Sequence, residues 1–70
     1  MNTTALYSVS EGIATITLNR PHRLNAINAE LLSDFKSALD QANADDDVQT
    51  IMLCGAGRAF CAGDDLKEFS

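Results

Sequence analysis

The sequence is poor in basic residues and has no long apolar run. Five Lys and Arg stand against ten Asp and Glu in 70 residues, so the formal net charge is −5 (5 − 10) with the single histidine neutral. Nucleic acids and anionic membranes bind basic faces, so this balance predicts neither as a partner. The longest apolar stretch, residues 51–57 with its glycines, falls well short of the roughly 18 residues that a membrane span needs.

Targeting, disulfide and metal signals are also missing. The first residues contain no basic segment followed by an apolar one, and no arginine-rich transit pattern, so we expect a cytoplasmic protein. Cys54 and Cys61 do not have C-x-x-C spacing, which argues against a zinc site. In the cytosol we expect them to be reduced packing residues. The acidic run at 45–47 lacks the alternating ligands of a calcium loop, and we predict no metal site.

The length allows one small domain at most, because typical domains have about 100–150 residues. A chain of this size buries only about 60% of the surface that its unfolded form exposes, so its stability alone would be marginal. The apolar fraction of 46% lies in the globular range and argues against wholesale disorder.

The hydrophobic pattern predicts the order strand, strand, helix, strand. Tyr7 and Val9 alternate with serines, and after a turn at Glu11-Gly12 residues 13–18 alternate again. These two runs predict an antiparallel hairpin, with Ala14, Ile16 and Leu18 on one face.

A helix is expected to follow, with Asn28 as its N-cap and its end within residues 43–47. An apolar stripe recurs at helical spacing: Leu31, Phe35, Ala38, Leu39 and Ala42. The charged residues of this helix, Asp34 among them, should lie largely outside the apolar stripe. Residues 48–54 predict a strand covered on both faces, parallel to the second strand in a βαβ unit.

The most informative segment is the small-residue loop that leaves this last strand, residues 55–65. Ligands of α/β proteins tend to bind at such loops, and free N–H groups at the start of the predicted next helix can meet an oxyanion. The alternative is a tight strand-to-helix turn built from glycines, because the loop matches neither the dinucleotide nor the P-loop pattern. Asp64 and Asp65 could serve as a carboxylate pair, but helix capping is the simpler role.

The loop after the second strand contains Arg20, His22 and Arg23 around Pro21. Guanidinium groups can meet phosphates, although such side chains are more often simply exposed. His22 has no nucleophile to pair with and is expected to be a solvated loop residue.

Two motifs resemble the signatures of the enoyl-CoA hydratase/isomerase, or crotonase, superfamily. Residues 16–21, Ile-Thr-Leu-Asn-Arg-Pro, followed by Leu-Asn-Ala at 24–26, resemble its first signature. Residues 57–68, Gly-Arg-Ala-Phe-Cys-Ala-Gly-Asp-Asp-Leu-Lys-Glu, resemble its second. The resemblance implies an α/β fold, the N-terminal ββαβ part of a crotonase-like (ClpP/crotonase) spiral domain, with residues 1–70 an N-terminal fragment of one such domain.

The resemblance also implies a function in fatty-acid or related CoA-thioester metabolism. The family stabilises a thioester enolate with two backbone N–H groups, and the first of these falls on Asp64, where many members have a small residue. The segment Arg23 to Ala26 should line the CoA channel, with Arg23 as a phosphate contact. The implied substrate and CoA contacts are Arg23, Leu24, Ala26, Ala62, Gly63, Asp64, Asp65 and Leu66. No separate cofactor is expected, because coenzyme A is part of the substrate.

What the family places after this region includes the second oxyanion donor, the acid/base carboxylates and the helices of its trimer interface. Glu11, Glu30 and Glu68 do not occupy its catalytic positions. The leading hypothesis is therefore that the chain is part of a hydratase that acts on a 2-enoyl-CoA. The 70 residues alone are expected to be inactive, and the full-length protein is expected to form a homotrimer or hexamer. The alternatives are a truncated, non-catalytic CoA-binding or assembly module, an inert remnant, or a small α/β fold without a link to CoA.

Overall fold

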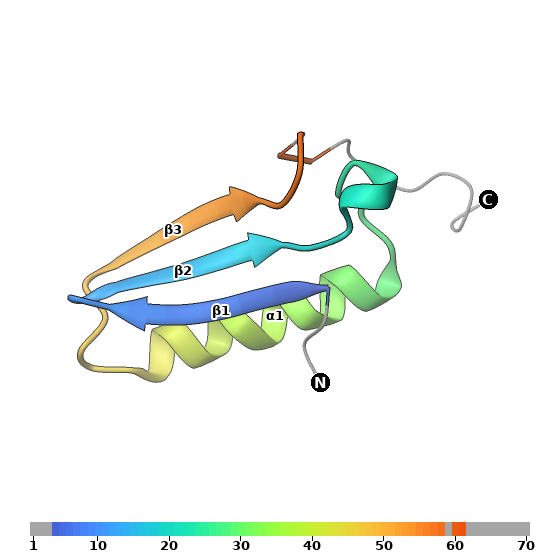
Figure 1. The fold of residues 1–70 in the computed structure, drawn as a ribbon. Coiled ribbons are helices and arrows are strands. Elements are labelled where there is room, and N and C mark those ends of the chain that lie inside the picture. The colour runs from blue at the N-terminus through green and yellow to red at the C-terminus, as the bar shows by residue number, and fades with distance from the viewer. Residues whose placement is uncertain (1–3, 59, 62–70) are drawn as a thin grey trace.

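The computed structural model describes residues 4–58 and 60–61. In chain order these form strand β1 (Ala5–Ser10), strand β2 (Ile13–Leu18), the 3-10 turn η1 (Pro21–Arg23), helix α1 (Ala29–Ala44) and strand β3 (Thr50–Gly55). The sheet order is β1-β2-β3, with β1 antiparallel and β3 parallel to β2 (Figure 1). The predicted hairpin and the parallel third strand are confirmed.

The hairpin turn and the start of β3 are joined at one glycine. Glu11 and Gly12 have φ values of 53° and 79°, and a two-residue turn with positive φ at both positions matches the twist of the flanking strands. The carbonyl of Gly12 accepts hydrogen bonds from the backbone N–H groups of Gln49 and Thr50, at 2.8 and 3.2 Å. This contact fixes where β3 begins, two residues later than the sequence pattern predicted.

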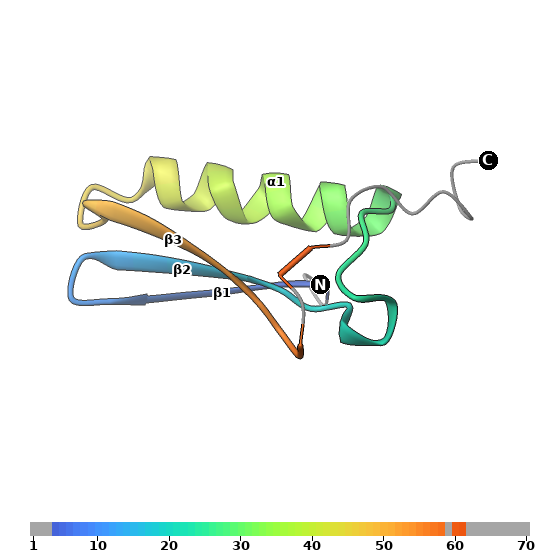
Figure 2. The ribbon, with the colours of Figure 1, turned by 90° about the horizontal axis from the view of Figure 1, so that it is seen from above.

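The core lies between α1 and one face of the sheet, as Figure 2 shows. Ala14, Ile16 and Leu18 are buried on β2, which confirms the predicted face. The predicted helix stripe is also confirmed: Leu31, Ala38 and Ala42 are buried and Phe35 and Leu39 are partly buried. Within the described part of the chain, no helix is long and apolar enough to cross a membrane.

The helix begins and ends where the local sequence predicted. The Oδ1 atom of Asn28 accepts a hydrogen bond from the backbone N–H of Leu31 at 2.9 Å, as expected for an N-cap. The helix ends at Ala44, and Asp45 follows as its C-cap, within the predicted range.

The prediction that Asp34 points away from the apolar stripe is wrong. The residue is buried, and its Oδ2 atom accepts hydrogen bonds from the backbone N–H and the Oγ1 of Thr4, at 3.1 and 2.6 Å. These two donors offset the cost of removing the carboxylate from water. A hydrophobic pattern cannot show this pairing, because the donors lie 30 residues earlier in the chain.

The prediction that the third strand is covered on both faces is also wrong for the described residues. Ile51, Met52 and Leu53 are 36%, 47% and 46% exposed. Ile51 and Leu53 lie in register with the buried Ala14 and Ile16, so they share the helix-facing side of the sheet. The helix packs over β1 and β2, however, and leaves the edge strand β3 largely uncovered.

Candidate functional site

The two motif-bearing loops leave the same edge of the sheet. Because β2 and β3 are parallel, their carboxyl ends lie side by side, and residues 19–28 and 56–61 continue from these ends (Figure 1). The strand ladder extends into the second loop, since the backbone N–H of Ala56 donates to the carbonyl of Leu18 at 2.8 Å. Ligand sites of parallel α/β sheets lie at this edge.

The first loop is a compact turn with two residues in the left-handed region. Leu24 and Asn25 have φ values of 53° and 57°, a conformation that Asn tolerates better than most residues and that is uncommon for Leu. The turn is closed by backbone hydrogen bonds of 2.8–3.1 Å within residues 20–26.

The expectation that Arg20 is exposed is wrong. Its side chain is buried, at 5% exposure, and its guanidinium donates to the backbone carbonyl of Ala26 across the turn. Burial of a guanidinium is tolerated because its donors find acceptors in the protein. Arg20 therefore stabilises the turn, and it is not available at the surface to meet a phosphate.

Asn25 connects the first loop to the second. Its side chain is fully buried, its Oδ1 accepts from the backbone N–H of Arg20 at 2.7 Å, and its Nδ2 donates to the carbonyl of Ala56 at 2.9 Å. The sequence pattern does not predict this role. The signal that could have suggested it is a lone asparagine between the apolar Leu24 and Ala26 in a loop.

The two loops also touch at Gly57 and Pro21. Gly57 has a φ of 81°, which favours glycine, and a Cβ atom placed on it would lie 2.8 Å from the Cβ of Pro21. A side chain at position 57 would therefore push the loops apart. This close approach explains one glycine of the second motif by contact rather than by turn formation alone.

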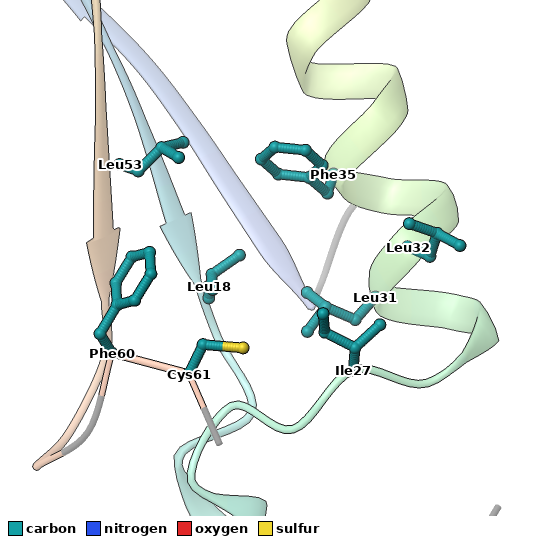
Figure 3. A pocket seen from close by; sticks show the side chains of 8 residues that line it. All are labelled: Leu18, Ile27, Leu31, Leu32, Phe35, Leu53, Phe60 and Cys61. Carbon is teal, nitrogen blue, oxygen red and sulfur yellow. The ribbon is translucent and has the colours of Figure 1, made fainter. Parts of the chain in front are cut away.

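An apolar pocket of about 180 Å³ lies beside this edge, between the first half of α1 and the ends of β2 and β3 (Figure 3). Every residue that lines it is apolar or a cysteine: Leu18, Ile27, Leu31, Leu32, Phe35, Leu53, Phe60 and Cys61. The pocket opens where α1 fails to cover β3. Apart from the thiol of Cys61, the described residues that line the pocket carry no polar side chain, so the pocket suits apolar contacts.

The sequence-predicted CoA contacts fall into two groups. In the first loop, Arg23 is half-buried, Leu24 is 36% exposed and Ala26 is buried, while His22 is exposed as expected. The other predicted residues, Ala62, Gly63, Asp64, Asp65 and Leu66, lie outside the described residues. The structure thus brings the first group to the carboxyl edge of the sheet.

Cys54 and Cys61 are not joined in a disulfide and are half-buried, and Cys61 packs against the core. This agrees with their prediction as packing residues. Among the described residues, no three His, Cys, Asp or Glu side chains gather in a group that could hold a metal ion.

Comparison with known proteins identifies the family. A sequence model described as enoyl-CoA hydratase/isomerase matches residues 8–70. The chain therefore belongs to the enoyl-CoA hydratase/isomerase family, and the predicted membership is confirmed. Both motifs lie inside the matched range.

Curated relatives carry several activities. The chain is 46% identical over 63 residues to a 1,2-epoxyphenylacetyl-CoA isomerase of Escherichia coli, covering 90% of this chain and 24% of that one. It is 46% identical over 65 residues to a probable enoyl-CoA hydratase of Rhodobacter capsulatus, covering 93% and 24%. The chain spans about a quarter of the length of these curated relatives.

Solved structures agree with the fold. The enoyl-CoA hydratase of Mycobacterium tuberculosis matches with a TM-score of 0.89 and 47% identity, over 94% of this chain and 30% of that one. An enoyl-CoA hydratase/isomerase from Mycobacterium paratuberculosis matches with a TM-score of 0.91 and 43% identity, over 96% and 25%. The predicted α/β, crotonase-like fold is confirmed for this region.

Proposed function

We propose that residues 1–70 are the N-terminal part of a single crotonase-like domain whose full protein adds water across the double bond of a 2-enoyl-CoA. The observation that carries this proposal is the meeting of both family motifs at one edge of the sheet. Asn25 of the first motif donates to Ala56, which directly precedes the second motif, and Gly57 of the second lies close to Pro21 of the first. The relatives named as enoyl-CoA hydratases support the reaction class.

The chemistry requires stabilisation of a developing oxyanion. Hydration places the water oxygen on the β-carbon and a proton on the α-carbon, and negative charge collects on the thioester oxygen between these steps. We assign the first donor to that oxygen to the backbone N–H of Asp64, because a main-chain donor does not depend on the side chain. Such a donor contributes about 10²–10³-fold to kcat. The second donor and the acid/base carboxylates would come from residues after Ser70.

The first loop would hold part of the coenzyme A moiety. Leu24 is accessible for apolar contact, and Arg23 is the arginine of the turn that remains partly accessible. Ala26 is buried, so its contribution would come from the backbone. The second loop would supply the remaining contacts: Ala62, Gly63, Asp64, Asp65 and Leu66. No cofactor is needed beyond the coenzyme A of the substrate.

A second candidate is double-bond isomerisation. One relative favours it: a trans-2-decenoyl-[acyl-carrier-protein] isomerase of Streptococcus mutans, which is 41% identical over 63 residues. Isomerisation moves a proton through the same kind of enolate, so it would use the same donor.

We further propose that the full-length protein is a cytoplasmic homotrimer or hexamer. The non-catalytic CoA-binding or assembly module remains the alternative from another class.

The test uses the native polypeptide at the length that its source cells make, established by intact mass. We expect it to hydrate crotonyl-CoA, and we expect Asp64→Pro, which removes the N–H, to lower kcat by about 10²–10³-fold. The control Asp64→Ala keeps the N–H and should retain most of the activity.

Three outcomes bear on the proposal. Equal activity of the two variants would contradict the donor assignment. A native protein that isomerises but does not hydrate would favour the second candidate. A native mass of 7.5 kDa with CoA binding but no turnover would favour the non-catalytic module.

A further inference from the structure

We propose that Asn25 is a positioning residue for acyl-CoA recognition, which holds the 23–26 turn against the end of β3 without touching the ligand. This inference rests on the proposed function, because it concerns the same site. It differs from the expectation that the whole segment from Arg23 to Ala26 lines the CoA channel, since the Asn25 side chain is fully buried.

The side-chain amide of Asn25 donates one hydrogen bond and accepts another. Asn25 uses its oxygen as acceptor, toward Arg20 N at 2.7 Å, and its nitrogen as donor, toward Ala56 O at 2.9 Å. A carboxamide carries both functions on one rigid group, whereas an ionised carboxylate can only accept. The two partners lie on either side of Asn25 in the chain, and Ala56 is 31 residues away.

Both hydrogen-bond partners of the Asn25 side chain, Arg20 and Ala56, are held in place by further backbone hydrogen bonds. The carbonyl of Arg20 accepts from the backbone N–H of Asn25 at 2.8 Å, so Asn25 and Arg20 are joined twice. Ala56 continues the β2–β3 ladder through its own N–H, which donates to Leu18 at 2.8 Å. The amide therefore ties the turn to the end of the parallel sheet. Moving the turn away from the sheet would break this hydrogen bond.

The position of the turn affects any ligand that binds at this edge of the sheet. The accessible residues of the turn, Arg23 and Leu24, precede Asn25 directly, and Leu24 shares its left-handed conformation. Loss of the amide would leave the partly buried Ala56 carbonyl without this donor, and polar groups shielded from water are costly to leave unsatisfied. The turn would then shift relative to residues 56–58, and small displacements of binding groups have large effects on affinity and rate.

The experiment compares Asn25→Asp with the matched control Asn43→Asp in the native polypeptide. Asp keeps the acceptor for Arg20 N but places a second oxygen against Ala56 O, whereas Asn43 is exposed near the end of α1 and undergoes the same change of charge. The readouts are the Kd of butyryl-CoA by calorimetry, KM and kcat for crotonyl-CoA, and the folded fraction by denaturant unfolding.

We expect Asn25→Asp to raise the Kd of the folded protein by about tenfold, which corresponds to about 1.4 kcal/mol. KM should rise by a similar factor and kcat should change much less, because the effect is on binding. Asn43→Asp should leave both unchanged. A purely structural role for Asn25 would lower the folded fraction without changing the Kd of the molecules that remain folded.

A second variant covers the case in which Asn25→Asp does not fold. Gly57→Ala places a Cβ atom against Pro21 and separates the same two loops without touching the amide. We expect it to raise the Kd, and we expect Pro21→Gly in the same chain to restore part of the affinity, because that change removes the Cβ that the alanine meets.

The outcomes separate the two proposals. If the native protein binds butyryl-CoA and Asn25→Asp binds it equally well, the role of Asn25 is overturned and the proposed function stands. The same holds if Asn25→Asp is unfolded and Gly57→Ala keeps the native Kd. If the native protein neither binds butyryl-CoA nor hydrates crotonyl-CoA, both proposals are overturned together.

Discussion

At the scale of single residues, the contact between Thr4 and Asp34 anchors the first described residue of the chain to the middle of α1. The hydrogen bond from the Thr4 hydroxyl, and then that from the Thr4 backbone N–H, hold the pKa of Asp34 below its ordinary value of 3.8, while burial acts in the opposite direction. Because the pKa is lower in the folded state, Asp34 contributes stability above pH 3.8. That contribution is lost as the pH falls through the folded-state pKa.

The variant Thr4→Val tests this contact. It removes the hydroxyl donor and keeps the backbone donor, so we expect the pKa of Asp34 to move up toward its ordinary value. We also expect the free energy of unfolding to fall less steeply with acid below pH 3.8 than in the original protein. NMR titration of the Asp34 carboxyl carbon and urea unfolding at several pH values measure the two quantities. The exposed Thr50→Val is the matched control, and an unchanged Asp34 pKa in Thr4→Val would contradict the assignment.

At the scale of elements, α1 depends on the cap at its start. Asn28 is buried and its Oδ1 satisfies the N–H of Leu31, which has no partner within the helix. Glu30 in the first turn adds a negative charge near the positive end of the helix dipole. Three acidic residues at 45–47 follow the other end, where negative charge opposes the dipole, so the N-terminal end carries the favourable part of this balance.

The capping role of Asn28 predicts how much stability is lost when its side chain is changed. Asn28→Ala should lower the free energy of unfolding by about 1 kcal/mol, whereas Asn28→Asp keeps an acceptor oxygen and should have a much smaller effect. Denaturant unfolding monitored by circular dichroism gives both values. Asn43→Ala, near the far end of the helix, provides the control for loss of an asparagine side chain. An equal loss of stability in the two Asn28 variants would show that the oxygen acceptor is not what matters.

At the scale of the whole molecule, the described residues show helix α1 packed over β1 and β2 and not over β3. The helix packs on β1 and β2, so β3 keeps one edge and much of its apolar surface exposed. Phe60 and Leu32, at the rim of the pocket, are 54% and 56% exposed as well. Exposed apolar patches and open strand edges promote association, because contact with another chain removes both from water.

The polypeptide of residues 1–70 by itself should therefore self-associate. We expect its weight-average mass by sedimentation to rise above 7.5 kDa as concentration increases. Met52→Lys places a charge in the exposed part of β3 and should reduce this rise, as lysines on natural edge strands do. Gln49→Lys, an exposed position just before the strand, makes the same change of charge and should have less effect. A concentration-independent mass of one chain would contradict the prediction.

The order of the elements, the bounds of β2 and the start of α1 follow from local sequence patterns alone. Alternation over residues 13–18, the stripe from Leu31 to Ala42 and the Asn28 cap each depend on neighbours within a few residues, so their signals can be read locally. The two family motifs were also recognisable by resemblance, which correctly indicated the family and the fold of this region.

The tertiary structure decided where the polar residues of the motifs go. Arg20 and Asn25 occur in a polar loop whose pattern is typical of exposed residues, yet both are buried. Arg20 reaches Ala26 only when the first loop folds into its turn, and Asn25 reaches Ala56 only when the two loops meet. Asp34 is buried for the same reason, with donors 30 residues away. The exposure of β3 likewise follows from where α1 lies across the sheet. Hydrophobic periodicity reports which side of an element is apolar, but pairing between distant segments decides which polar groups can be buried and which apolar ones stay exposed.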